Sequence, residues 1–153
     1  MFCRSLAFLL STILFASASS HTLVPCRSGV TSGAFAVPEF NNDDGFVSGD
    51  LYQGDFLIVR YHWEGTLHRI KSPCLSCIEG TIEGTLDDGI GPGPDFVVRG
   101  RYVGNFFVGN GDFSARVFKT TGGAALGSIH GTFSDPPNDG APGSFLGSWR
   151  ICD

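Results

Sequence analysis

Four stretches of the chain share one seven-residue pattern, in which glycine and a large apolar residue alternate and polar residues fill most positions between them. Because side chains in a β-strand point alternately to its two faces, this spacing places the glycines and large apolar residues on one face. The pattern therefore predicts β-strands with one packed face and one mostly polar face. The full copies are residues 80–86, 100–106, 127–133 and 143–149, and a partial copy covers 63–67.

The repeated glycines favour a small closed barrel. Glycine weakens a strand, so its regular use inside strands needs a reason such as sharp curvature or close approach of a neighbouring bulky side chain. A barrel supplies both, whereas a β-sandwich explains the alternation equally well but the glycines less well. We predict an all-β fold consisting of a single antiparallel β-barrel of about eight glycine-rich strands. The large residues predicted to face its interior are Ile82, Tyr102, Ile129, Phe145 and Trp149.

Turn residues place the connections between these strands. The segments 109–112 and 121–123 are glycine-rich and short enough for antiparallel hairpins. Two longer loops rich in Pro, Gly and Asp, residues 87–95 and 134–142, are predicted to lie at one end of the barrel. Further strand candidates upstream are residues 34–37, 46–49 and 55–63.

The segment 55–64 concentrates aromatic and titratable side chains, and two registers are open for it. In the favoured register, which continues into the partial repeat, Leu57, Val59, Tyr61 and Trp63 face inward. Three charged or titratable residues then form an outward stripe, namely Arg60, His62 and Glu64. The opposite register would place Arg60 and His62 inside, where they could bind an anion or transfer a proton.

Residues 1–20 have the pattern of a secretory signal peptide. Arg4 provides a short basic region, an apolar run follows, and Ala16-Ser17-Ala18 is a small-residue cleavage pattern. The apolar run is about half of the roughly 20 residues that a membrane span needs, and no later segment resembles a span. We therefore predict a secreted, extracellular protein with one barrel domain, residues 21–153.

Composition narrows the range of partners. The chain has 153 residues, of which 16% are charged, and a formal net charge of -5 without any run of Lys or Arg. It therefore lacks the basic surface that nucleic acids or anionic lipids require, and neither is a predicted partner.

Four cysteines remain after signal cleavage, an even number that predicts two disulfides in an oxidising compartment. Three connectivities are possible, and we prefer Cys26–Cys152 with Cys74–Cys77 because closing a barrel brings the ends of its chain together. A thioredoxin-like redox centre at Cys74–Cys77 would need a βαβ setting that this chain does not show. Zinc would need further ligands at metal spacing, so no metal site is predicted.

The motifs of hydrolases and of nucleotide-binding enzymes are not found in this sequence. There is no Gly-x-Ser-x-Gly elbow, no His-Glu-x-x-His and no phosphate-binding glycine loop before a helix. We predict no cofactor, and any enzymatic activity would be of a cofactor-free, isomerase-like kind.

The stretch 108–115, Val-Gly-Asn-Gly-Asp-Phe-Ser-Ala, resembles the glycine-rich turn followed by Phe and a small residue in dirigent proteins and allene oxide cyclases. The resemblance covers about residues 95–133, roughly a quarter of the chain. It implies an eight-stranded antiparallel barrel whose cavity steers a reactive intermediate into one ring or one stereoisomer. No acidic residue or tyrosine of either family is matched residue by residue.

Two classes of function follow from these observations. In the first, the barrel holds a hydrophobic small molecule in its interior and guides its cyclisation or stereoselective coupling by confinement. In the second, the protein is a non-enzymatic secreted effector or surface-binding module that acts through its loops. What separates the two classes is whether the interior is hollow or filled. In the first class the ligand-binding residues would be Tyr61, Trp63, Tyr102, Phe106 and Trp149.

Overall fold

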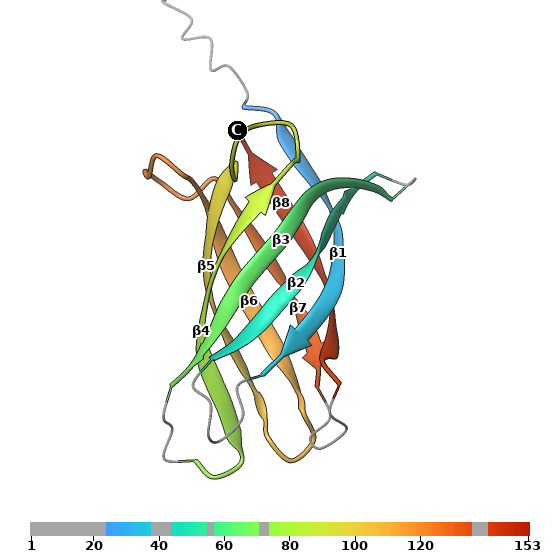
Figure 1. Ribbon diagram of the computed structural model, residues 1–153, viewed down its shortest axis with the longest axis vertical. Helices are drawn as coiled ribbons and strands as arrows, with labels where there is room; N and C mark the ends of the chain where they lie inside the picture. Colours follow the sequence, from blue (N-terminus) through green and yellow to red (C-terminus); the bar gives the residue numbers. More distant parts are fainter. Residues whose placement is uncertain (1–23, 38–43, 55–56, 71–73, 136–140) are drawn as a thin grey trace, which may run out of the picture.

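Eight antiparallel strands form a closed barrel, as the glycine pattern predicts (Figure 1). The computed structural model describes residues 24–37, 44–54, 57–70, 74–135 and 141–153, which contain no helix. Each strand pairs with its neighbours in sequence, and the last strand pairs with the first. The strands are β1 (Cys26–Ala36), β2 (Asp44–Gln53), β3 (Ile58–Arg69), β4 (Cys77–Asp87), β5 (Phe96–Asn105), β6 (Asn110–Lys119), β7 (Gly127–Ser134) and β8 (Gly143–Cys152).

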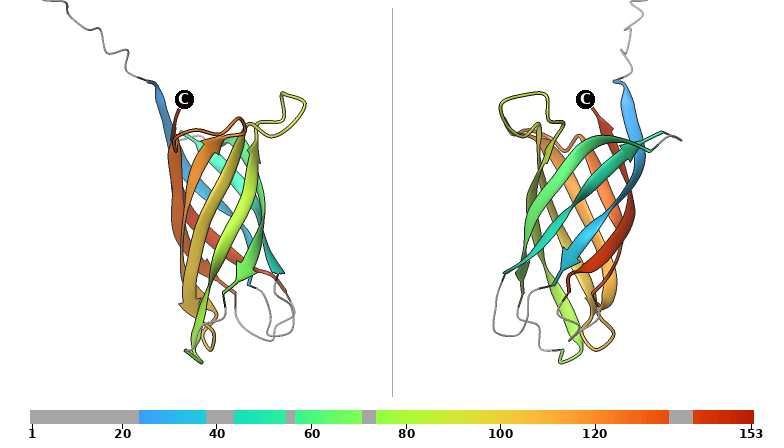
Figure 2. Two further views of the ribbon diagram at one scale, coloured as in Figure 1. Left: turned by 90° about the vertical axis from the view of Figure 1, so that its left-hand side faces the viewer. Right: turned by 45° about the vertical axis from the view of Figure 1, so that its right-hand side comes forward.

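The connections alternate between the two ends of the barrel because every strand reverses direction (Figure 2). The upper end, as drawn in Figure 1, carries the β2–β3, β4–β5 and β6–β7 connections together with Cys26 and Cys152. The lower end carries the other four connections. The prediction that loops 87–95 and 134–142 share one end is therefore wrong: β4–β5 and β7–β8 are an odd number of strands apart, so these two loops leave from opposite ends.

The repeat face points into the barrel, as predicted. Ile82, Tyr102, Ile129, Phe145 and Trp149 are at most 3% exposed. The polar positions between them lie on the outer wall, where Arg101, His130 and Thr132 are exposed. The closed barrel thus buries one face of every strand without needing a second layer.

The inward glycines come in pairs that face each other across neighbouring strands. Gly33 is opposite Gly49, Gly65 opposite Gly84, and Gly131 opposite Gly147. At these pairs the backbones approach so closely that a Cβ atom on Gly131 would lie within 3.0 Å of the Leu146 carbonyl oxygen. A side chain is therefore excluded at such positions, and a large residue on another strand can occupy the space above them.

The start of β3 departs from the predicted register. The pairing with β2 shifts at Leu51/Tyr52, so that Tyr61 is opposite Leu51 while Val59 is opposite Tyr52. This β-bulge inserts Arg60 as an unpaired residue and reverses the facing of everything before it. Tyr61 and Trp63 point inward as predicted, but the inward placement of Leu57 and Val59 is wrong, since these side chains are 58% and 42% exposed.

Two disulfides join the cysteines in the predicted pairing. Cys26–Cys152 ties β1 to β8 at the upper end, where the two residues are opposite each other in the strand register. Cys74–Cys77 closes a four-residue loop just before β4 at the lower end. Such cross-links are typical of proteins that fold in oxidising compartments.

The signal peptide predicted for residues 1–20 lies outside the described residues. Within the described ranges, no helix has the length and apolar character needed to cross a membrane.

Replacing one member of a glycine pair should destabilise the barrel strongly. We expect Gly131→Val to lower the free energy of unfolding by about 3 kcal/mol, because its side chain would clash with the backbone of β8. The matched control is Thr132→Val, at an exposed outward position, which should change stability by less than about 0.5 kcal/mol. Urea unfolding of both variants measures this, and equal losses would contradict the register.

The two disulfides should differ in their effect on stability. Cys26–Cys152 spans 126 positions and Cys74–Cys77 only three, so the chain-entropy model gives about 5 and about 2 kcal/mol respectively. We expect the double variant Cys26→Ser/Cys152→Ser to unfold at much lower urea concentration than Cys74→Ser/Cys77→Ser. The reverse order would show that the loop at the lower end, and not the closure of β1 on β8, holds the fold together.

Candidate functional site

The five residues predicted to bind a ligand are distributed along the whole length of the barrel. Tyr61 and Trp149 contact each other near the upper end, with ring centroids 5.9 Å apart. Trp63 lies in the middle, while Tyr102 and Phe106 lie towards the lower end. Four of the five are at most 2% exposed, and Phe106 is partly buried against the core. Tyr61 and Trp149 are thus in direct contact, while Trp63 and Tyr102 lie at other levels of the barrel.

Aromatic rings occupy the barrel interior in three layers. Tyr61, Phe96 and Trp149 form the upper layer, and Trp63, Phe113 and Phe145 form the middle layer; the contacting rings within these layers have centroids 5.4 to 5.9 Å apart. The lower layer is Phe35, Tyr102 and Phe133, in which Phe35 stacks on Phe133 at 4.4 Å.

Contacts also join the lower two layers to each other. Phe35 lies 6.0 Å from Phe113 and 6.5 Å from Phe145 between ring centroids. Aliphatic side chains such as Leu51, Ile82 and Ile129 fill positions around the rings, and all three are fully buried. An eight-stranded barrel is just wide enough for side chains to fill it, and here side chains from every strand occupy the interior.

Tyr102 carries a polar group into this apolar interior. Its hydroxyl is buried and has no hydrogen-bond partner among the described residues. Burial raises the pKa of Tyr102 to about 12, an effect that the nearby Arg69 guanidinium partly opposes. The neutral phenol is therefore the form that the folded protein favours.

A second tyrosine, Tyr61, connects the interior to the upper rim. Arg27 donates a hydrogen bond of 3.2 Å to its hydroxyl, and Arg27 also lies 3.7 Å from the Asp153 carboxylate. The hydrogen bond to Tyr61, and then the charge of Asp153, raise the pKa of Arg27. On the other side, the guanidinium of Arg60 lies over the Tyr61 ring at 5.3 Å from its centroid.

Arg60, unlike Arg27, has no ion pair among the described residues. No carboxylate lies within ion-pair distance of Arg60 in the described part of the chain, and its buried Nε has no acceptor there. The Asp50 carboxylate on β2 is already engaged, because His62 lies 2.6 Å from it and Tyr52 donates a hydrogen bond to it. At the β-bulge, the Arg60 guanidinium therefore has an N–H donor, at Nε, without an acceptor among the described residues.

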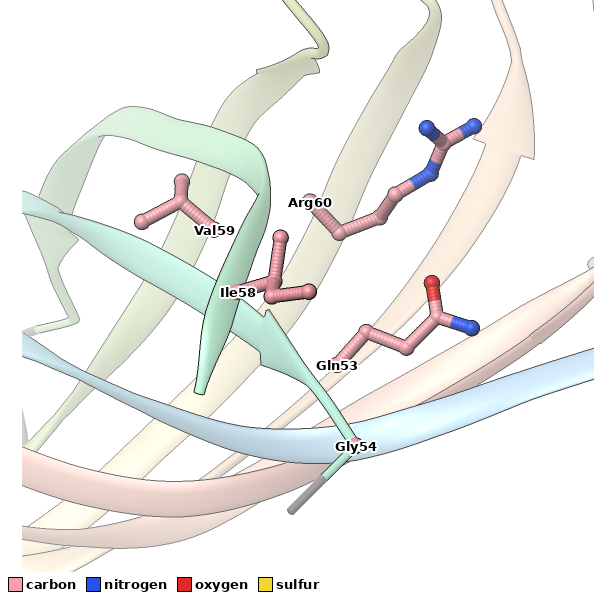
Figure 3. A pocket seen from close by; sticks show the side chains of 5 residues that line it. All are labelled: Gln53, Gly54, Ile58, Val59 and Arg60. Atoms are coloured by element: carbon pink, nitrogen blue, oxygen red, sulfur yellow. The ribbon is translucent and has the colours of Figure 1, made fainter. Parts of the chain in front are cut away.

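A pocket of about 430 Å³ lies beside Arg60 at the β2–β3 hairpin. We call it the rim pocket; it is lined by Gln53, Gly54, Ile58, Val59 and Arg60. Figure 3 shows that Gln53, Ile58 and Arg60 project to the same side of the hairpin, whereas Val59 points to the other. The pocket opens to solvent, since Ile58 is 64% exposed. Ile58 gives it an apolar wall, and Gln53 and Arg60 give it a polar wall.

The hairpin beside the rim pocket has a strained backbone. Leu57 has a φ of 50°, a left-handed conformation that branched and bulky residues adopt only at a cost of about 1–3 kcal/mol. It donates a backbone hydrogen bond to Gly54 and leaves its own side chain 58% exposed. Strain of this kind is concentrated at functional sites more often than elsewhere.

Exposed apolar side chains also gather at the lower end. Leu75, in the disulfide-bonded loop before β4, is 89% exposed, and Phe107 and Val108, in the β5–β6 turn, are 69% and 58% exposed. The two loops are joined, because the Phe106 amide donates a 2.8 Å hydrogen bond to the Ser76 carbonyl. We call these three residues the apolar tip. They are held on a rigid support, as contact residues on loops commonly are.

Three carboxylates lie close together in the β4–β5 loop, within 4.8 Å of one another. Each accepts a hydrogen bond from a backbone amide of its own loop: Asp87 from Gly89, Asp88 from Ile90, and Asp95 from Asp88. Such bonds are the usual means by which aspartate stabilises a tight turn. Turn formation therefore accounts for the cluster.

No family model matches this chain, and neither a curated protein nor a solved structure matches it. The resemblance to dirigent proteins and allene oxide cyclases stays a prediction. The assignment of function consequently depends on the geometry of the barrel itself.

The unpaired hydroxyl of Tyr102 gives a prediction about pH. The pKa of Tyr102 is raised in the folded state, so above about pH 10 unfolded chains lose the hydroxyl proton while folded chains keep it. The free energy of unfolding therefore falls between about pH 10 and 12. We expect Tyr102→Phe to be within about 1 kcal/mol of wild type at pH 7, since no hydrogen bond is lost, and to show a smaller fall above pH 10.

Urea unfolding at pH 7, 9, 10 and 11 measures this effect. Tyr61→Phe is the control, because it removes the acceptor of the Arg27 hydrogen bond and should lower stability already at pH 7. An unchanged alkaline fall in Tyr102→Phe would show that another group is responsible.

Proposed function

We propose that the protein is a secreted, non-enzymatic binding module that contacts its partners at the two ends of the barrel. The observation that carries the proposal is that three layers of contacting aromatic rings occupy the interior. A ligand inside would have to displace rings from these layers. Each contacting pair of rings stabilises the fold by about 0.5–1.5 kcal/mol beyond the contribution of its buried area. The ends, in contrast, present exposed apolar and charged groups.

The distribution of exposed apolar residues supports this assignment. The rim pocket at the upper end includes Ile58 and Val59, and the apolar tip at the lower end includes Leu75 and Phe107. Apolar side chains exposed in groups on loops are typical of interaction sites. The two disulfides and the signal-peptide pattern of residues 1–20 support the secreted location.

The alternative function, confinement of a hydrophobic molecule inside the barrel, makes a different demand on the same residues. Trp63 and Trp149 would then contact the ligand, and the rings around them would have to separate. Both tryptophans are at most 2% exposed and pack against neighbouring rings. Their emission therefore reports directly on which function is correct.

We expect mature protein incubated with a lipophilic extract of the producing organism to keep its tryptophan emission unchanged. The variants Trp63→Phe and Trp149→Phe each leave one reporter, in the upper and in the middle layer respectively, and neither reporter should respond. Any compound that co-purifies should shift NMR signals of residues at the barrel ends and leave the methyl signals of Ile82 and Ile129 in place.

The opposite result is equally clear. A compound released in stoichiometric amount on denaturation, together with a change in the emission of either single-tryptophan variant, would place the ligand inside the barrel and overturn the proposal.

A further inference from the structure

We infer that the rim pocket is a binding site for a small carboxylate that carries an apolar chain. The inference deepens the proposed function, on which it rests, by assigning a ligand class to one end of the barrel. Its elements are the pocket beside the β2–β3 hairpin, the uncompensated Arg60 guanidinium and the exposed Ile58 side chain.

The guanidinium of Arg60 calls for an anionic acceptor. Its Nε is shielded from solvent without a hydrogen bond, although the side chain as a whole is partly exposed at the pocket. A buried donor left unpaired is unfavourable, and a carboxylate meets a guanidinium through two parallel hydrogen bonds. Because Nε itself is shielded, the two oxygens would accept from the terminal nitrogens Nη1 and Nη2, and the carboxylate would balance the charge of the guanidinium.

The charge at the rim favours a monoanion. Arg60 and Arg27 both contact Tyr61, one over the ring and one at the hydroxyl, but Arg27 is already paired with Asp153. One positive charge is therefore left uncompensated among the described residues at this position. A carboxylate balances it, whereas the dianion of a phosphate monoester would require a second free cation.

The remaining lining specifies the rest of the ligand. Ile58 lies between Gln53 and Arg60 on the same side of the hairpin and is 64% exposed, so covering it with an alkyl chain removes apolar surface from water (Figure 3). The Gln53 amide can donate a further hydrogen bond to the carboxylate. A volume of about 430 Å³ lies within the range of small-molecule sites.

Octanoate is a suitable probe, with octan-1-ol and octylammonium as neutral and cationic molecules of the same chain length. We expect titration followed by NMR to show saturable binding of octanoate, with shifts at Gln53, Ile58 and Arg60, and at least about 10-fold weaker binding of the other two. Affinity should rise from butanoate through hexanoate to octanoate, and Ile58→Ser should reduce this rise.

Substitution of Arg60 tests the assigned contact. Arg60→Gln should weaken octanoate binding about 10-fold or more, and Arg60→Lys should fall between it and wild type because a lysine keeps the charge but not the two parallel donors. The control is Arg99→Gln, an exposed arginine on the outer wall of β5, which should bind as wild type does. The ligand series on unaltered protein gives a result even if Arg60→Gln does not fold.

Four outcomes would contradict the inference. Equal binding of octanoate and octan-1-ol, or unchanged binding by Arg60→Gln, would remove the guanidinium from the site. Failure of octanoate to bind, with tryptophan emission unaffected by the extract, would overturn this inference and leave the proposed function standing. Octanoate binding that shifts the Ile82 methyl signals and changes Trp63 emission would overturn the proposed function as well.

Discussion

Aromatic rings packed against the backbone of paired glycines are the interaction on which the rest of this barrel depends. Atoms of the Phe145 ring lie within 3.0 Å of the positions that Cβ atoms on Gly33 and Gly49 would take, and atoms of the Phe133 ring lie as close to those of Gly104 and Gly111. These two rings thus need glycine pairs on other strands, and those pairs leave room for the rings. Neither part could change alone without a clash or a cavity.

This packing also decides where the protein can bind a partner. Rings occupy the interior from the layer of Tyr61 to the layer of Phe35. We therefore expect polar contacts with a partner to form at the ends of the barrel. The alternating pattern breaks at the β2–β3 hairpin, where the β-bulge leaves Arg60 half-buried and without an ion pair among the described residues. A local departure from regular pairing thereby brings a pocket and an unsatisfied donor together at this hairpin.

The sequence predicts the barrel interior well and the rim poorly. Where the seven-residue pattern holds, as at Ile82 or Trp149, the two-residue period alone identifies the buried face, and the meeting of the chain ends identifies the Cys26–Cys152 pair. A β-bulge, however, is a property of two paired strands and leaves no period in either one. For this reason the pattern favours the register with Arg60 on an outward stripe and Val59 inside, and no period in the segment indicates where the register changes.

The central claim is that side chains fill the barrel, and xenon tests it most directly, because xenon enters dry apolar cavities without requiring any particular chemistry. Crystals of the mature protein under xenon pressure should show no xenon among the aromatic rings, whereas Phe133→Ala, which removes a ring from the lower layer, should bind it beside Phe35 and Tyr102. Ordered xenon among these rings in the wild-type protein would contradict the account and restore the barrel interior as the binding site.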